Sequence, residues 1–491
     1  MLTPGEIKQL IENDQASDKK RHAMVGQRYY EANHDIKDFR IFFINADGNL
    51  QEDTLKSNIK ISHPFLTELI DQKVQYMFSG KDAYIRSDIP ELQNELDERF
   101  NFNDEFNAEL EELLTGASSK GFEYMYAYKG QDEKTAFKCA DSLGVVEVRK
   151  SETDDGCEYI IYHYIDRIGK DNQKIRRIQV WDETQTWYYV QEDNGGIILD
   201  DSVEINPRPH ILFKEGKDER LHYDGYGFIP FFRLDNCKKQ FSDLKPIKSL
   251  IDDYDLMSCG LSNNIQDTNE ALYVVKGFQG DNLDELMFNT RGKKHIGVDE
   301  DGGVEVMTTD IPYEARKIKL ELDEKNIYRF GMGFNSAQLG DGNITNIVIK
   351  SRYALLDLKC NKMEKRLKQF MRKLLKVVLK EINDTEGTDY QMKDLYFDFQ
   401  REVMTNAQDN AQIELTDAQK QQVQINTLLN LSSHLDNETI MQNICDVLDL
   451  NYEEIKDKLP KEEANDPYAV KETLANIVPE DDQGTGGVVN A

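Results

Sequence analysis

The chain has 491 residues, of which 31% are charged and 39% are hydrophobic, so we expect a folded, very polar protein of roughly two to four structural units. Its formal net charge of −31 argues against a protein that grips DNA through its phosphates, although it fits either simple solubility or a surface that lies near DNA without adhering to it. No segment approaches the roughly 20 consecutive apolar residues of a membrane span, and the first residues lack the pattern of a secretory signal, so we expect synthesis in a cytoplasm and no membrane partner.

The first half of the chain is predicted to form helices and then a β-rich region. Apolar residues recur at helical spacing over residues 5–33, 64–78 and 91–115. From residue 122 to residue 213, short runs rich in Tyr, Val, Ile and Trp are separated by turn signals, among them Asp193–Gly196. This pattern predicts an antiparallel β region that is supported by the preceding helices.

Two helices on either side of a small β excursion are predicted in the middle of the chain. The first covers residues 243–267, where apolar positions form one helical face, and the second covers residues 312–330. Between them, the runs LYVVKGF, KKHIGV and VEVM are typical of short strands. We expect Asp299–Gly303 to form the turn between the last two runs.

A segment rich in Gly and Asn precedes an unusually long helical pattern. Residues 331–346 cannot form regular structure, because Gly and Asn dominate them. The pattern over residues 347–382 would give a helix of roughly 54 Å, which suits a strut in a larger assembly better than an ordinary globular helix. We then expect a strand at residues 395–400, followed by a helical C-terminal part with helices at residues 416–434, 437–448 and 469–477.

No sequence motif indicates catalysis or a bound cofactor. The chain has no phosphate-binding loop, no HExxH pair, no nucleophile elbow and no kinase signature. Its eight histidines are isolated in sequence, its six cysteines lack CxxC spacing, and Asp299–Gly302 lacks the ligand spacing of a calcium loop. We therefore expect free thiols, no catalytic residue, no metal site and no cofactor.

One segment reverses the acidic balance of the chain. Residues 359–380 contain nine basic residues and a single acid, Glu364, along a helix whose other face is apolar. Two interpretations remain open, a basic face that pairs with acidic neighbours of this very acidic protein and a surface that faces phosphates. Phe370 is the only aromatic residue in the segment, which does not suit a stacking platform for single strands.

Two blocks of sequence carry a resemblance to a known family. Residues 229–278 contain Ile-Pro, Ser-Asp-Leu and Leu-Ile-Asp-x-Tyr-Asp, and the match continues through Ser258, Asn263, Asp267 and Leu272. The second block covers residues 340–370. Both blocks resemble the portal proteins of tailed double-stranded DNA bacteriophages, specifically the long-tailed-phage family that forms dodecameric rings. The family often has Ser-Gly near the start of the long helix, where this chain has Asn346 followed by Ile-Val-Ile.

The resemblance implies an α+β portal fold with a β-containing wing, a two-helix stem, a small α/β clip, a tunnel loop with a long kinked helix, and a helical crown. The implied boundaries are residues 1–235 for the wing, 236–267 for the first stem helix, 268–311 for the clip, 312–330 for the second stem helix, 331–346 for the tunnel loop, 347–404 for the long helix and a strand that returns to the wing, 405–477 for the crown and 478–491 for a disordered tail.

The resemblance also implies which residues face the partners. The tunnel loop, which would line the DNA channel, contains Asn335, Gln338, Gly340, Asp341, Asn343 and Asn346. The clip, where a motor and an adaptor would dock, contains Lys293, Lys294, His295, Asp299 and Glu300. The stem contains Asp252, Asp253, Tyr254, Glu321 and Glu324.

The function implied by the resemblance is structural and not enzymatic. The chain would form a homo-oligomeric ring of about twelve subunits at one capsid vertex of the virion, assembled in the host cytoplasm. Double-stranded DNA would pass through the ring without sequence recognition during packaging and ejection. The expected partners are the terminase large subunit, the head–tail adaptor, and the major capsid and scaffolding proteins. Two alternatives remain, another oligomeric head–tail connector component and, less favoured by the missing motifs, a DNA-processing enzyme.

Overall fold

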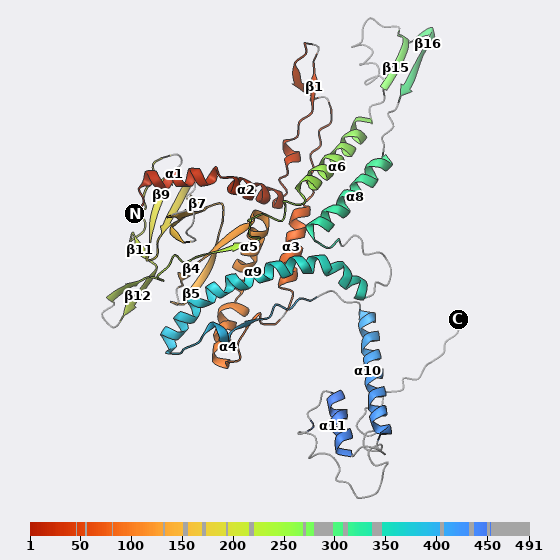
Figure 1. Ribbon diagram of the computed structural model, residues 1–491. Helices are drawn as coiled ribbons and strands as arrows, with labels where there is room; N and C mark the ends of the chain where they lie inside the picture. Colours follow the sequence, from red (N-terminus) through yellow and green to blue (C-terminus); the bar gives the residue numbers. More distant parts are fainter. Residues whose placement is uncertain are drawn as a thin grey trace. The chain divides into compact units, whose positions relative to one another are not determined.

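The computed structural model describes residues 1–45, 47–54, 56–80, 82–130, 133–150, 156–168, 173–192, 195–215, 220–268, 272–278, 298–307, 313–335, 346–402, 407–431, 437–448 and 452. The chain divides into two units. The first comprises Met1–Gly340 and Lys350–Val403, and the second comprises Asp341–Ile349 and Met404–Ala491. Helices and antiparallel sheets both contribute to the first unit, which agrees with the predicted α+β class (Figure 1).

Two helices occupy the region where one long N-terminal helix was predicted. Helix α1 (Pro4–Gln15) begins with a capping box formed by Thr3 and Glu6. Helix α2 (Asp18–Tyr30) is preceded by Ser17, which is its N-terminal capping residue. The Ser17 side chain accepts a hydrogen bond from the backbone N–H of Lys20, as expected for the first residue before a helix. The prediction of a single helix over residues 5–33 was therefore wrong, because Ser17 caps a new helix in the middle of a continuous apolar pattern.

The next predicted helix is also divided. Helix α3 (Phe65–Met77) agrees with its prediction. The predicted helix at 91–115 consists of α4 (Pro90–Leu96), the π-helical turn η2 (Asp97–Asn101) and α5 (Asp104–Lys120). Asn103 separates η2 from α5, because its side chain accepts a hydrogen bond from the N–H of Phe106 and so starts a new helix.

The predicted β region is confirmed as antiparallel. The largest sheet has the order β10-β9-β8-β7-β6, and β11 pairs with β9. A second sheet has the order β14-β4-β5, and two-stranded sheets join β12 to β13, β1 to β2 and β17 to β3. The strand bounds are β1 (Phe42–Ile44), β2 (Leu50–Glu52), β3 (Ile85–Arg86), β4 (Phe122–Lys129), β5 (Thr135–Ala140), β6 (Val145–Arg149), β7 (Cys157–Ile168), β8 (Gln173–Trp181), β9 (Gln185–Glu192), β10 (Ile198–Leu199), β11 (Arg208–Pro209), β12 (Ile211–Glu215), β13 (Arg220–Asp224), β14 (Phe231–Asp235) and β17 (Tyr396–Phe397).

Of the predicted turn at Asp193–Gly196, residues 193 and 194 lie outside the described residues, and Gly195 and Gly196 stand between β9 and β10, which pair with each other. The predicted strand at 395–400 is present as the short β17, which pairs with β3 of the N-terminal part. Helix α1 covers the large sheet, since Ile7 and Ile11 are buried in one cluster with Val146, Ile161 and Trp187 of that sheet. Burial of these apolar side chains is what holds α1 against the sheet.

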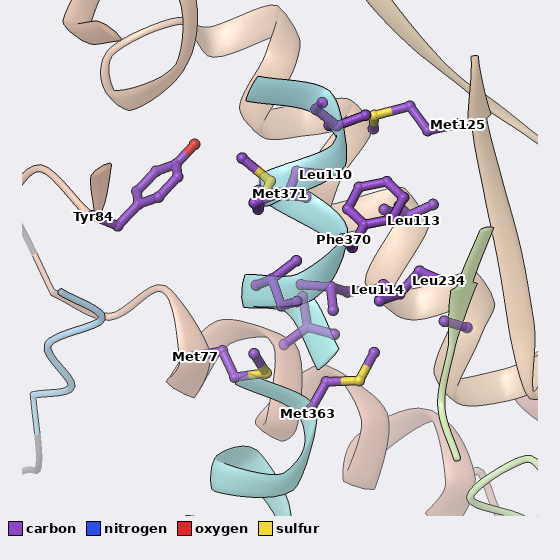
Figure 2. Packing of buried hydrophobic residues seen from close by; sticks show 14 of the residues in the cluster. Met77, Tyr84, Leu110, Leu113, Leu114, Met125, Leu234, Met363, Phe370 and Met371 are labelled. Carbon is purple, nitrogen blue, oxygen red and sulfur yellow. The ribbon is translucent and has the colours of Figure 1, made fainter. Parts of the chain in front are cut away.

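The largest hydrophobic core is built around α9 (Asn346–Glu386), a helix of 41 residues that spans about 62 Å. Figure 1 draws α9 as bent rather than straight. Its apolar face is buried in one cluster with side chains of α3, α5, β4 and β14. Figure 2 shows Phe370 and Met371 of α9 near Leu110 and Leu113 of α5, and Met363 near Met77 of α3. The predicted helix at 347–382 is thereby confirmed, with one additional residue at its start and four at its end.

The two helices predicted in the middle of the chain are α6 (Lys248–Thr268) and α8 (Tyr313–Gly331). Between them in the chain, β15 (Leu272–Phe278) pairs with β16 (Val298–Met307). The prediction that Asp299–Gly303 forms a turn between two strands was wrong, because these residues lie inside β16, where the register shifts between Lys276 and Phe278 of β15. Gly277, at φ +65, lies opposite this irregular stretch.

The second unit contains α10 (Ala407–Asn430) and α11 (Asn437–Val447), which contact each other. Ile440, Ile444 and Cys445 of α11 are buried. Helix α11 agrees with its prediction, whereas α10 begins nine residues before the predicted start at residue 416 and ends at Asn430 instead of residue 434. The predicted helix at 469–477 and the predicted disordered tail lie outside the described residues.

Candidate functional site on the α6–α8 helix pair

Helices α6 and α8 lie side by side (Figure 1). Lys319 forms an ion pair that joins them. Nζ of Lys319 on α8 lies 2.5 Å from Oδ2 of Asp253 on α6, and it also forms an ion pair with Asp323 on α8. Asp323 is buried, whereas Lys319 and Asp253 remain partly exposed. An exposed ion pair contributes little stability, so we assign Lys319 mainly to fixing how the two helices align.

The C-terminal half of α8 packs on α3. Ile327 and Tyr328 are buried, and the ring of Tyr328 meets the ring of Phe65 edge to face with centroids 6.0 Å apart. The hydroxyl of Tyr328 donates a hydrogen bond to Glu68 of α3 at 2.5 Å. The pair of helices is therefore anchored on the main core and does not stand alone.

The predicted stem residues take part in contacts within the chain. Asp252 accepts hydrogen bonds from Lys248 at 2.8 Å and from the hydroxyl of Tyr29. The ring of Tyr254 is half-buried and meets the rings of His63 and Phe65 edge to face, with centroids 4.8 and 4.9 Å apart. These contacts orient Asp252 and Tyr254 toward the N-terminal segments of the same subunit.

The two predicted stem acids of α8 differ in their surroundings. Glu321 is exposed. Glu324 accepts a hydrogen bond from the side-chain amide of Asn335 at 2.8 Å. Asn335, which was predicted to belong to the tunnel loop, is thus hydrogen-bonded to α8. This contact fixes the direction in which residues 332–335 leave the helix.

Asp255 on α6 is a central residue that sequence reasoning missed. Its side chain is completely buried, with Oδ2 2.6 Å from Nδ1 of His34 and Oδ1 2.7 Å from Nδ1 of His63. The backbone N–H of His63 donates a third hydrogen bond at 3.0 Å. Burial alone would raise the pKa of Asp255, but the hydrogen bonds from His34 and His63 outweigh it and hold this pKa below its ordinary value.

The rest of α6 binds an extended strap formed by residues 57–63. Oδ1 of Asn263 accepts from the N–H of Ile59 at 2.7 Å, and Oδ1 of Asp267 accepts from the N–H of Ser57 at 3.1 Å. Asn263 and Asp267, together with Asp255, belong to the block that carried the family resemblance. Their spacings of eight and four residues place them on one face of α6, where they satisfy backbone donors of the strap.

A second buried network holds the segment before α6. The carboxylate of Asp243 lies 3.1 Å from Nζ of Lys73 on α3 and 3.1 Å from Nζ of Lys359 on α9. Burial would raise the pKa of Asp243, but the two ammonium charges outweigh it and lower this pKa well below its ordinary value. Asp243 is the acid of the Ser-Asp-Leu motif, so the motif joins three segments that are far apart in sequence.

The clip and tunnel-loop predictions fall only partly on described residues. Asp299 and Glu300 are exposed on β16. Asn346 is the first residue of α9. The remaining predicted residues lie outside the described part of the chain: Lys293, Lys294, His295, Gln338, Gly340, Asp341 and Asn343.

Neither a metal-ligand cluster nor a membrane-spanning helix is found among the described residues. Among them, no set of three or more His, Cys, Asp or Glu side chains could hold a metal ion. All six cysteines are free thiols, as predicted. No helix within the described ranges is both long and apolar enough to cross a lipid bilayer. What the arrangement does is hold α6, α8 and the segments strapped to them in a fixed geometry.

Comparisons with known proteins extend over most of the chain. The family model described as phage portal protein, SPP1 Gp6-like, matches residues 9–467. The portal protein of Bacillus phage SPP1 is 29% identical over 391 residues, which cover 78% of this chain and 75% of that relative. The portal protein of Clostridium phage phiCD119 is 24% identical over 423 residues, which cover 83% of this chain and 88% of that relative.

Proposed function

The chain belongs to the SPP1 Gp6-like family of phage portal proteins, and from this membership we propose that it is the repeating subunit of a ring of about twelve copies at one capsid vertex of the virion. Double-stranded DNA enters through this ring during packaging and leaves through it during ejection. Neither the family description nor the names of the relatives indicate a catalytic activity, in keeping with a structural role.

The observation that carries this proposal is the construction of the α6–α8 pair. Helices α6 and α8, which flank the paired strands β15 and β16 in the chain, are aligned by Lys319 and anchored through Asp255 and Tyr328 on the rest of the subunit. Such a rigid, protruding unit suits a stem that is repeated around a channel, because each copy must present the same face to its neighbours. The segment order of the structure supports a stem made of α6 and α8, although the first helix begins at Lys248 and so covers only part of the implied range 236–267.

The charge of the chain supports passive conduction of DNA. Twelve copies of −31 give a ring of about −370, which repels phosphates and so disfavours a fixed register of the duplex. The exposed carboxylate of Glu321 on α8 is of the right sign for a stem surface that DNA passes. A segment rich in Gly and Asn between α8 and α9 would touch the backbone weakly, and this is the role we propose for the tunnel loop.

The segment between α6 and α8, which contains the paired strands β15 and β16, is the proposed docking site for partners. We assign residues 268–311 to the clip, on which the terminase large subunit docks during packaging and the head–tail adaptor afterwards. Of the five residues proposed for docking, Asp299 and Glu300 lie among the described residues, and both are exposed. The wing, residues 1–235, and the crown, residues 405–477, would face the major capsid and scaffolding proteins, with assembly taking place in the host cytoplasm.

Native mass spectrometry combined with negative-stain imaging tests this function. The purified protein is expected to form closed rings of about twelve subunits with a central hole, alone or after addition of scaffolding protein. A compact dimer without a hole under both conditions would contradict the proposal. An assembly of the expected mass located away from the portal vertex of the particle would instead identify another connector component.

A further inference from the structure

The solvent-facing side of α9 carries a continuous stripe of exposed basic side chains. The residues of this basic stripe are Lys362, Lys365, Arg372, Lys373, Lys376 and Lys380. They recur every three or four residues, except that Gln369 takes the place of one cation and that Arg372 and Lys373 are adjacent, and at helical geometry they lie along one side of the helix. The opposite side of α9 is buried in the main hydrophobic core, which holds the stripe on a rigid support (Figure 2).

The basic stripe is not neutralised by the described part of the subunit. Two other lysines of the same segment do have carboxylate partners, since Lys359 pairs with Asp243 and Lys368 pairs with Glu364. Arg372 lies over the ring of Phe397 at 5.8 Å. None of the six stripe residues forms an ion pair with any described carboxylate, in a chain that has 91 acids and 60 bases. The first interpretation, a basic face that pairs with acidic neighbours, therefore holds for Lys359 and Lys368 but not for the six stripe residues.

The spacing of the stripe makes it unfavourable in isolation. Lys362 and Lys365, Arg372 and Lys376, and Lys376 and Lys380 are like charges three or four residues apart, an arrangement that destabilises a helix. Only Lys380 has an acid one turn away, at Asp384. A polyanion bound along the stripe would remove this repulsion.

We propose that the basic stripe of α9 binds the phosphate backbone of double-stranded DNA. From Lys362 to Lys380 the stripe extends for about 27 Å, which corresponds to about eight base pairs of a duplex. Five of its six cations are lysines, which act as point charges and do not impose a base sequence. No aromatic side chain is exposed along it, so it lacks the stacking groups that bind single strands.

A protein partner fits this surface less well. Between Lys362 and Lys380 every apolar side chain is buried, so the stripe offers no hydrophobic anchor. The cores of protein interfaces are depleted of lysine and enriched in aromatic anchors, which is the opposite of what this face presents. The choice of DNA among polyanions rests on the proposed function of the chain, while the stripe itself does not depend on ring formation.

Fluorescence anisotropy of the full-length protein with a labelled 20-base-pair duplex of arbitrary sequence tests the proposal. Six phosphate contacts predict a slope of about −5.4 in log affinity against log salt, which is about a two-thousandfold loss between 50 and 200 mM. The variant with Lys365→Gln, Lys373→Gln, Lys376→Gln and Lys380→Gln keeps two contacts. It should show a slope of about −1.8 and lose only about twelvefold over the same range.

A matched control changes the net charge equally but leaves the stripe intact. It carries Lys8→Gln, Lys150→Gln, Lys238→Gln and Lys239→Gln, all at exposed positions, and should keep the slope of the unmodified protein. A further variant with arginine at the four stripe positions should also keep it, because the charge is retained. If the stripe variant keeps the affinity and slope of the control, or if it binds DNA normally but fails to assemble, the inference is wrong. If the stripe variant and its control both form normal rings, the proposed portal function is unaffected by the result for DNA. Failure of this inference and failure of the proposed function can therefore be distinguished.

Discussion

Nδ1 of His34 lies 2.6 Å from Oδ2 of Asp255, and both side chains are completely buried. His34 follows α2, whereas Asp255 is in the second turn of α6, so the contact joins segments separated by 221 residues. Because Asp255 also contacts His63, one carboxylate anchors two N-terminal segments on α6. The alignment of α6 on the subunit depends on that carboxylate.

The substitution Asp255→Asn should therefore destabilise the protein. An amide directs an N–H toward one of the two histidine donors, so at least one buried donor loses its acceptor, at a cost of about 3 kcal/mol in the free energy of unfolding. Urea denaturation followed by circular dichroism measures the change. The control Asp384→Asn, at an exposed position of α9, should change the free energy of unfolding by less than about 0.5 kcal/mol. Equal stability of the two variants would refute the anchoring role.

Removal of the Asp243 carboxylate should be more costly than removal of one of its lysine partners. In Asp243→Ala both Lys73 and Lys359 lose their counter-ion, and we expect a loss of about 3–5 kcal/mol. In Lys359→Met the pair between Lys73 and Asp243 remains, and the loss should be about half as large or less. Thermal unfolding of the two variants ranks them, and a larger loss in Lys359→Met would contradict the proposed network.

Glu381 on α9 should make stability depend on acidic pH. Burial would raise its pKa, but hydrogen bonds from Arg99, Lys129 and Thr135 outweigh it and lower the pKa to about 2, against 4.5 for the free side chain. Because the folded pKa is the lower one, the contribution is complete above pH 4.5 and is lost as the pH falls from 4.5 toward 2. It is on the order of 2 kcal/mol.

The variant Glu381→Gln isolates this contribution from those of other carboxylates. It should be less stable than the unmodified protein at pH 7, and the difference should shrink at pH 3, as measured by urea denaturation at both values. A difference that is the same at the two pH values would show that Glu381 acts through packing and not through its charge.

Gly333, two residues beyond α8, should not tolerate a side chain. A Cβ at this position would lie 2.0 Å from Cδ2 of Leu69, which is completely buried in the main core and has little room to move. We expect Gly333→Ala to cost about 1–3 kcal/mol. Gly303 in β16 has no atom within 4 Å of such a Cβ, so Gly303→Ala is the matched control and should not destabilise. Thermal melts of both variants check the difference.

Charge reversal in the proposed clip should weaken the docking of the motor. Lys293, Lys294 and His295 lie outside the described residues, and their role rests on the proposed assignment of residues 268–311 as the clip. Replacing all three by Glu should lower the affinity of assembled rings for the terminase large subunit at least about tenfold, mainly by slowing association. Biolayer interferometry measures both rates, with Lys8→Glu as an exposed control. Unchanged binding would remove these residues from the docking surface.

Long periodic segments could be predicted from the sequence with good accuracy. Helices α3, α8 and α11 begin and end within one residue of their predicted bounds, and α9 agrees to within four residues. A single strong apolar face over many turns specifies a helix locally, whatever the rest of the fold does. The breaks were missed because a capping residue such as Ser17 changes the local hydrogen bonding without interrupting the apolar pattern.

The α+β class, the order of the segments and the family could be derived from the sequence alone, since these depend on local periodicity and on motifs that are contiguous in the chain. The roles of Asp243 and Asp255 emerge only in the folded chain, because their partners Lys73, Lys359, His34 and His63 come from distant segments. The tertiary structure also decided that six cations of α9 face outward while Lys359 and Lys368 are neutralised. The physical reason is that the chain pattern sets which side of a helix is apolar, whereas the charge of the other side depends on which carboxylates folding brings within reach.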